Sequence, residues 1–371
     1  MGTGQEGFRD HAARVRCPAA AGLHPGTRLP SSRRRERVLV DPTVRVRRPV
    51  DRGAVFQREI ARMKVIPLAA ESLGVRSMAT YVEVGRTGIL IDPGATLAPS
   101  RFGLPPAEEE WEALRRANDR ISAYAARSSL VFVSHYHEDH FRSDPASYAG
   151  RLVLAKDPRR MIGGRQAQRA EALWKALEGQ ARVQSADGAQ RREMDLELYV
   201  SSPLPHGADG TTFGSVVVLT IVDPAERERF IFASDLQGPA SPVAAAYLVQ
   251  QRPTLLYLSG PVSYLERDVG RDAIERAIDH LMRVLDVTGC RVIMDHHALR
   301  DAGFAERFSR LWETGRVVTA AAYLGLPEAP LESRRNRAWA AVRKPPARAG
   351  APRATISGPT PRRFAKGGLT E

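Results

Sequence analysis

Residues 134–140 read SHYHEDH and follow directly on the apolar run LVFV. The stretch places three histidines and two carboxylates within six positions. On a loop that leaves a strand, His135 and His137 can converge on one ion, whereas Asp139 and His140 are offset to reach a second ion beside it. Imidazole nitrogen with carboxylate oxygen suits Zn²⁺ and also Fe, Mn or Co. Four ligands from one loop cannot close two metal sites, so further His or Asp side chains must arrive from elsewhere.

Ligand-type residues also follow three later apolar runs. His206 comes after LYVSSPLP, Asp235 comes after FIFAS, and His296 with His297 follow RVIMD. Strands whose ends meet at one edge of a fold would bring these side chains together. Six of the nine histidines lie in SHYHEDH or in these later places, and scattered surface histidines would not cluster in this way. The pattern predicts one metal centre built from several strand ends.

The basic charge of the chain belongs to its two ends. The chain has 371 residues and is 43% apolar, which is enough for one large core or two modest ones. Its net charge is +13, of which residues 1–62 carry +8 and residues 342–371 carry +6, so that the middle is at −1. We therefore expect one folded domain over 63–341 between two disordered basic ends. For 1–62, a mis-assigned start with Met63 as initiator and a functional basic arm are the alternatives.

The cysteines and the hydropathy indicate a cellular compartment. The two cysteines, Cys17 and Cys290, lie far apart and suit reduced thiols in a reducing environment. No run approaches the roughly 20 apolar residues of a membrane helix, and the N-terminal stretch lacks the apolar run of a signal peptide. We expect a cytoplasmic protein that has no membrane partner, and the oligomeric state stays open.

Strand and helix patterns alternate from residue 63 onward. TYVEV and GILI flank a glycine-containing turn and indicate a hairpin that ends at Asp92. Residues 105–128 carry apolar side chains at helical spacing, from Trp111 to Tyr124, after two prolines. Because strands occur both in hairpins and in alternation with helices, we expect a sandwich of sheets covered by helices, in the α/β class.

The order of these residues resembles the five-motif pattern of the metallo-β-lactamase superfamily. Its members share an αββα sandwich of two mixed sheets with a two-metal site between them. The pattern runs through Asp92, the H-x-H-x-D-H loop of 135–140, His206, Asp235 and His296. The wording of ILIDPG, FVSHYHEDHF, FASDLQGP and DHHALRD is similar to a mostly archaeal family of predicted hydrolases of this superfamily that have no assigned substrate. The resemblance covers about 63–341.

The resemblance also implies a ligand set and two divalent metal ions, with Zn²⁺ first and Fe or Mn as alternatives. The first ion would be bound by His135, His137 and His206, the second by Asp139, His140 and His296, and both would be bridged by Asp235. Asp139 could also orient a hydroxide, which makes it the candidate catalytic residue. Asp92 would hold the loop through hydrogen bonds. A turn role for Asp92 and a loop role for His206 are the alternatives.

Some neighbouring residues have more than one interpretation. A strand that runs straight into the site presents the first residue after it, which favours His296 as ligand and leaves His297 as an alternative ligand or a group that faces the substrate. Arg142 and Arg300 are candidates for binding an anionic substrate, although arginines at the surface or paired with carboxylates explain them equally well. His280, inside an amphipathic helix pattern, is interpreted as structural.

Two ions that share a water can lower its pKa and present hydroxide to an electrophilic centre. The leading hypothesis is therefore a metal-dependent hydrolase of an ester, lactone, thioester or phosphodiester in a small-molecule substrate. The alternative is a nuclease of the same superfamily, because residues 156–192 carry 9 Lys and Arg against 4 Asp and Glu. The nearly neutral middle of the chain argues against nucleic acid. A metal-free binding scaffold would not need the intact ligand set, and a redox diiron site is disfavoured because His137 stands where such members carry Glu.

Overall fold

The computed structural model describes residues 63–193 and 196–343. Two mixed sheets form its centre. The first sheet has the strand order β1-β2-β3-β4-β5-β6, antiparallel from β1 to β3 and parallel from β3 to β6. Its strands are β1 (Met63–Pro67), β2 (Thr80–Val84), β3 (Thr87–Ile91), β4 (Leu130–Val133), β5 (Leu152–Ala155) and β6 (Arg182–Ser185).

The second sheet has the order β15-β14-β13-β12-β11-β8-β7. Strands β12 to β15 are parallel, whereas β7, β8, β11 and β12 are antiparallel neighbours. Its strands are β7 (Gln190–Glu193), β8 (Leu196–Val200), β11 (Leu219–Asp223), β12 (Glu228–Phe232), β13 (Leu255–Ser259), β14 (Arg291–Asp295) and β15 (Val317–Val318). A separate short pair consists of β9 (Leu204–Pro205) and β10 (Ser215–Val216).

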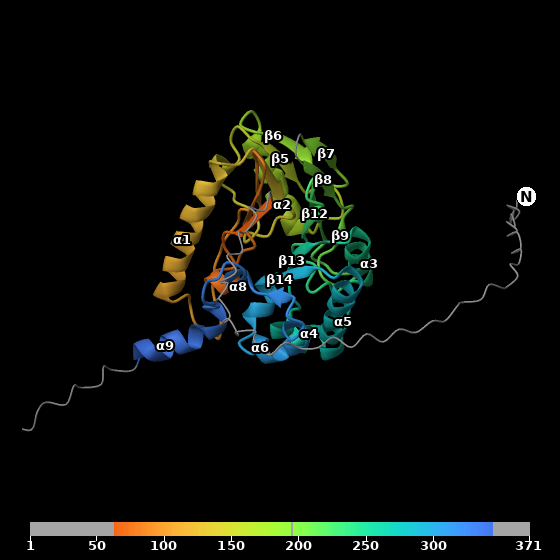
Figure 1. The fold of residues 1–371 in the computed structure, drawn as a ribbon. Coiled ribbons are helices and arrows are strands. Elements are labelled where there is room, and N and C mark those ends of the chain that lie inside the picture. Colours follow the sequence, from red (N-terminus) through yellow and green to blue (C-terminus); the bar gives the residue numbers. More distant parts are fainter. Residues whose placement is uncertain (1–62, 194–195, 344–371) are drawn as a thin grey trace, which may run out of the picture. The chain divides into compact units, whose positions relative to one another are not determined.

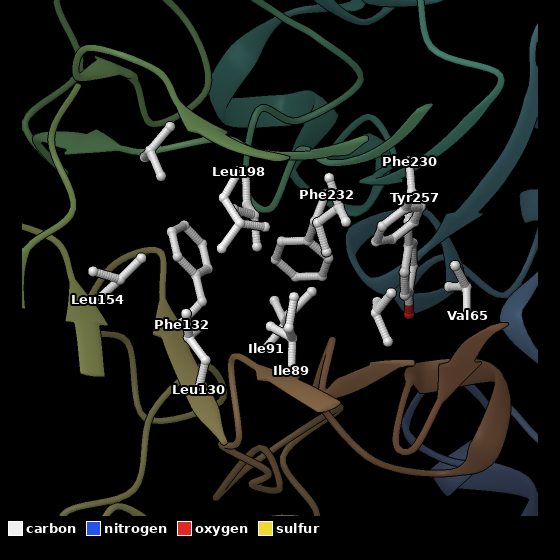
Figure 2. Close-up of a cluster of buried hydrophobic side chains, with 14 of the residues drawn as sticks. Val65, Ile89, Ile91, Leu130, Phe132, Leu154, Leu198, Phe230, Phe232 and Tyr257 are labelled. Atoms are coloured by element: carbon white, nitrogen blue, oxygen red, sulfur yellow. The ribbon is translucent and has the colours of Figure 1, made fainter. Parts of the chain in front are cut away.

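The two sheets pack face to face through side chains that alternate along each strand. Ile89 and Ile91 of β3 point into the core between the sheets, where they face Phe232 of β12, and Phe230 of β12 points into the same core beside Tyr257 (Figure 2). The residue between the two phenylalanines, Ile231, points to the opposite face of its sheet. This period of two is what an extended strand dictates when both of its faces are covered.

Helices cover the outer face of each sheet. Helices α1 (Glu108–Ala125) and α2 (Gly164–Leu177) pack on the first sheet, and α3 (Pro242–Gln251) and α5 (Arg271–Thr288) pack on the second. Figure 1 shows α1 on one side of the sheets and α3 with α5 on the other. The predicted αββα sandwich of two mixed sheets is confirmed, and α1 lies within the predicted range 105–128. Its buried stripe runs through Ala113, Ala117 and Ile121, so Trp111 stays 45% exposed.

Short helices and turns connect these layers. They are η1 (Glu71–Leu73), η2 (Pro145–Ser147), η3 (Ser263–Leu265), α4 (Glu266–Val269), η4 (His296–Arg300), α6 (Phe304–Arg307), α7 (Ser309–Trp312), α8 (Ala320–Tyr323), η5 (Glu332–Arg334) and α9 (Arg335–Arg343). Helix α9 ends two residues beyond the predicted domain boundary at 341. The predictions for 1–62 and for the tail beyond 343 lie outside the described residues. Among the described helices, none combines the length and the apolar character needed to span a membrane.

Candidate metal centre

The candidate metal ligands follow the ends of strands from both sheets. Asp92 comes directly after β3, and the 134–140 loop comes directly after its parallel neighbour β4. In the second sheet, Asp235 lies three residues after β12 and His296 comes directly after β14. Because the carboxyl ends of parallel strands meet at one edge of a sheet, residues far apart in sequence are brought together there.

One group of four donor atoms fits a single ion. Nδ1 of His137 lies 3.1 Å from Nε2 of His135 and 3.2 Å from Nε2 of His206. Oδ2 of Asp235 lies 3.2 Å from Nε2 of His206 and 3.5 Å from Nε2 of His135. Donors bonded to one zinc ion at the usual lengths and at tetrahedral angles are roughly 3.3–3.4 Å apart. The spacing of this group therefore matches a four-coordinate ion.

A second group lies beside the first and shares Asp235 with it. Nε2 of His296 lies 3.2 Å from Nε2 of His140, 3.6 Å from Oδ2 of Asp139 and 3.5 Å from Oδ1 of Asp235. Oδ1 of Asp235 is buried and has no hydrogen-bond partner among the described residues. A buried carboxylate oxygen without a partner is costly unless a cation occupies the space in front of it. The residues present therefore fit two ions bridged by one carboxylate.

Asp92 orients the second group from behind. Nδ1 of His140 donates to Oδ2 of Asp92 at 2.9 Å, which leaves Nε2 free to face the site. The other carboxylate oxygen accepts from the backbone N–H of Ser134 at 2.7 Å, and the Ser134 hydroxyl donates to Asp92 as well. Asp92 adopts a left-handed backbone with φ 44°. Asp92 therefore contacts both the start of the loop and His140 at its end.

Glu71 was missed by sequence reasoning and is the counterpart of Asp92 on the other side. Its Oε2 accepts from Nδ1 of His296 at 2.7 Å, and its Oε1 accepts from Nε of Arg300 at 2.7 Å. Arg300 in turn donates through Nη2 to Oδ2 of Asp139 at 3.0 Å. Glu71 belongs to a 3₁₀ turn in a stretch without periodicity. The only signal in the sequence is one acidic residue among the apolar and small residues of LAAESLG.

The two adjacent histidines both lie beside Asp235, and these three side chains form a further group that could hold an ion. His296 also lies with Asp139 and His140. His297 stacks on His296 with ring centroids 4.5 Å apart, and its Nε2 is 3.7 Å from Oδ2 of Asp235. Its Nδ1 is buried and makes no hydrogen bond within the described residues. His297 lines the cavity in front of the site, the position of a group that faces a substrate.

Burial and neighbouring charges shift the pKa values of several candidate ligands. Burial lowers the pKa of His135 to about 4 and that of His137 to about 2, so both rings are neutral at pH 7 with a lone pair available. For Asp139 and Asp235, burial acts to raise the pKa, but the neighbouring histidines outweigh it and hold both pKa values well below the usual range. His135 and His137 are thus neutral donors beside ionised carboxylates. His140 differs, because burial acts to lower its pKa but Asp235 and Asp92 outweigh it and hold that pKa well above the usual value.

The two candidate substrate-binding arginines have different positions. Arg300 is buried and lines a cavity of about 330 Å³ that also contacts His137, Asp139 and His206. Arg142 is not among the residues around this cavity. Its guanidinium donates to the Asn118 side chain at 2.7 Å and to the Ser122 hydroxyl at 2.9 Å, which anchors the metal loop to α1. Its hydrogen bonds point to a structural role.

Comparison with known proteins gives the family of the chain. No family model matches it. A UPF0282 protein of Pyrococcus horikoshii is 37% identical over 288 residues, which cover 74% of this chain and 92% of that protein. A UPF0282 protein of Methanocaldococcus jannaschii is 36% identical over 287 residues, covering 74% and 96%. The chain belongs to the UPF0282 family. The names of these relatives state a family and no activity, so the function of this member has to be argued from its site.

Solved structures with a similar fold have low sequence identity to this protein. The metal-dependent hydrolase Tm1679 of the beta-lactamase superfamily has a TM-score of 0.42 and 12% identity, covering 69% of this chain and 95% of that one. The isothiocyanate hydrolase from Delia radicum gut bacteria has a TM-score of 0.40 and 15% identity, covering 66% and 94%. At this level of similarity nothing about the substrate carries over to the UPF0282 chain.

Proposed function

We propose that the chain is a metal-dependent hydrolase that uses two divalent cations, with zinc as the expected metal and iron or manganese as alternatives. The observation that supports it most is that two groups of possible metal ligands lie side by side and open onto one cavity. Asp235 belongs to the first group and lies 3.5 Å from His140 and His296 of the second. The proposed ligands are His135, His137 and His206 for one ion, Asp139, His140 and His296 for the other, and Asp235 for both.

When bound, such ions lower the pKa of water and neutralise negative charge that develops in the transition state. The side chains around them do the positioning. Asp139 is held by Arg300. Its carboxylate can accept a hydrogen bond from the attacking water, which orients the lone pair of the water oxygen toward the substrate. His297 follows the end of β14, and Tyr264 follows the end of its parallel neighbour β13. Both side chains line the cavity and can hold the substrate against the site.

The cavity volume favours a small substrate. About 330 Å³ lies at the lower end of the range of small-molecule sites. We propose hydrolysis of an ester, lactone, thioester or phosphodiester bond. A nuclease is the second candidate, because Arg76 and Arg169 also line the cavity. Both of these arginines are already paired, with Glu332 and Glu138 respectively, which leaves less positive charge for a polynucleotide.

The test is metal content together with activity in the full chain. Metal would be measured by plasma mass spectrometry, and turnover would be measured on bis-p-nitrophenyl phosphate, lactones, thioesters and a single-stranded RNA. We expect about two ions per chain and turnover that His137→Ala abolishes. His280→Gln is the matched control, because His280 lies on α5 and bonds the Pro239 carbonyl. A wild type that takes up no metal, or full turnover in His137→Ala, would refute the proposal.

A further inference from the structure

We propose that the substrate carries a second anionic group, a phosphate or a carboxylate, which binds in an arginine-lined recess beside the metal cavity. The recess has a volume of about 760 Å³ and is lined by Arg101, Arg267 and Arg271 together with η3 and α4. The inference rests on the proposed function, because it concerns the substrate of the same site. It narrows that substrate to a molecule with a scissile bond at one end and an anionic group at the other.

The recess and the metal cavity adjoin each other. Tyr264 and Leu265 line both of them. The Tyr264 ring lies near two guanidinium groups: that of Arg300, which lines the metal cavity, is 5.8 Å from the ring centroid, and that of Arg101, which lines the recess, is 5.4 Å from it. Nη2 of Arg101 donates to the backbone carbonyl of Arg300 at 2.8 Å. A molecule at the metal site can therefore extend past one aromatic ring into the recess.

The recess holds positive charge that carboxylates do not neutralise. Arg267 and Arg271 form no ion pair with any described residue, whereas Glu266 beside them is paired with Arg307. The arginines Arg76, Arg169 and Arg300 of the metal cavity are each paired with a glutamate. In the recess, Arg101 is also paired, with Nε 4.0 Å from Glu332, so the unneutralised charge is that of Arg267 and Arg271. Asp268 also lines the recess, and its carboxylate would compete with a bound anion for the guanidinium groups of Arg267 and Arg271.

Arginine suits the proposed ligand. Its planar guanidinium gives two parallel N–H groups to a carboxylate or a phosphate, and it keeps its charge at all physiological pH values. Arg267 and Arg271 flank Gly270, whose φ of 83° turns the chain between α4 and α5. The two side chains therefore start close together on either side of one turn, and both line the recess.

The opposite side of the metal cavity does not offer the same environment. A cavity of about 570 Å³ adjoins it through Glu138 and Arg169. That cavity also carries Asp119 and Asp144, and the Arg142 guanidinium within it is already bonded to the Asn118 and Ser122 side chains. An anionic group would be repelled there, so the charge distribution directs it to the recess.

The test is binding of 1,6-hexanediol bisphosphate, whose six-carbon chain separates its two phosphates, to the metal-loaded full chain by isothermal titration calorimetry, with inorganic phosphate as the short anion. We expect Arg267→Ala/Arg271→Ala to weaken binding of the bisphosphate about tenfold or more and to leave binding of phosphate, which reaches only the metal site, nearly unchanged. Asp268→Asn should tighten binding of the bisphosphate. The control Arg276→Ala/Arg283→Ala removes the same charge from exposed positions of α5 and should have little effect.

The outcomes separate this inference from the proposed function. Equal affinity of wild type and Arg267→Ala/Arg271→Ala for the bisphosphate would overturn the proposed anion site in the recess, whatever the hydrolysis assays give. Equal losses in the two double variants would also overturn it, because they would show a general effect of charge. If binding of single-stranded RNA depended on Arg267 and Arg271 and binding of the bisphosphate did not, the ligand of the recess would be a polynucleotide and the proposal of a small anion would be wrong. Absence of turnover with recess binding intact would count against the hydrolase alone.

Discussion

Glu71 and His296 lie 225 positions apart in the chain, and Oε2 of Glu71 accepts a hydrogen bond of 2.7 Å from Nδ1 of His296. The contact joins the 3₁₀ turn after β1 to the turn after β14, and both side chains are almost fully buried. A carboxylate on Nδ1 fixes the tautomer that leaves Nε2 as the donor for a metal. Glu71 is therefore a positioning residue for His296.

Glu71→Gln should weaken the second ion selectively. Glutamine keeps the size of the side chain but removes the carboxylate that accepts the hydrogen bond from Nδ1 of His296, and loss of such a partner costs roughly 10- to 100-fold in metal affinity. Competition with a fluorescent chelator would measure the two binding steps separately, and the first step should not change. Glu83→Gln on β2 is the control, since Glu83 is paired with the exposed side chains of Lys64 and Arg127. Weakening of both steps to the same extent would contradict a role through His296.

Removal of the metal should destabilise the protein. A ligand that binds only the folded state stabilises it by about 4 kcal/mol when its concentration is 1,000 times Kd. Treatment with a chelator should therefore lower the melting temperature of the wild type by several degrees, and added Zn²⁺ should restore it. In His137→Ala, the melting temperature should respond much less to either treatment. A wild-type melting curve that the chelator does not change would contradict a resident metal.

The sequence could predict the parts of the site that are local or that follow strands. SHYHEDH lies within one loop, and His206, Asp235 and His296 each follow an apolar run, so their convergence follows from strand ends that meet. Glu71 could not be found in this way, because its partners are set by packing between distant turns. Arg142 stands two residues after His140 in the chain, yet its bonds to Asn118 and Ser122 turn it toward α1. Such directions depend on neighbours that only the tertiary structure supplies.

Glu332→Gln should reduce stability in a way that depends on pH. Glu332 receives two hydrogen bonds from Arg76, at 2.5 and 2.7 Å, in a part-buried position. Burial acts to raise the pKa of Glu332, but the contacts with Arg76 hold it below the ordinary value of 4.5. A depressed pKa in the folded state gives stability that is present above the unfolded pKa and is lost as the pH falls through the folded value. The variant should lose about 2 kcal/mol of unfolding free energy at pH 7.

Urea unfolding at several pH values between 7 and 3.5 would measure this difference. The gap between wild type and Glu332→Gln should be constant from pH 7 to about pH 5 and should narrow below that. Glu109→Gln at the exposed start of α1 is the control, because Glu109 forms no ion pair with any described residue. A gap of the same size at pH 3.5 as at pH 7 would mean that charge is not its source.

Gly94→Ala should displace the metal-binding loop, because the backbone of that loop lies directly against Gly94. A Cβ atom there would stand 2.4 Å from the Phe141 nitrogen, 2.6 Å from the His140 nitrogen and 2.7 Å from the Glu138 carbonyl oxygen. These are backbone atoms, so rotation of a side chain cannot relieve the clash, and overpacking of this kind costs typically about 1–3 kcal/mol. Asp139 and His140 lie inside the displaced segment, so metal affinity should fall along with the melting temperature. Gly164→Ala at the start of α2 is the matched control, since its added methyl group meets no atom within 4 Å. A Gly94→Ala protein with wild-type metal affinity would show that the loop reaches its ligand geometry without support from the turn after β3.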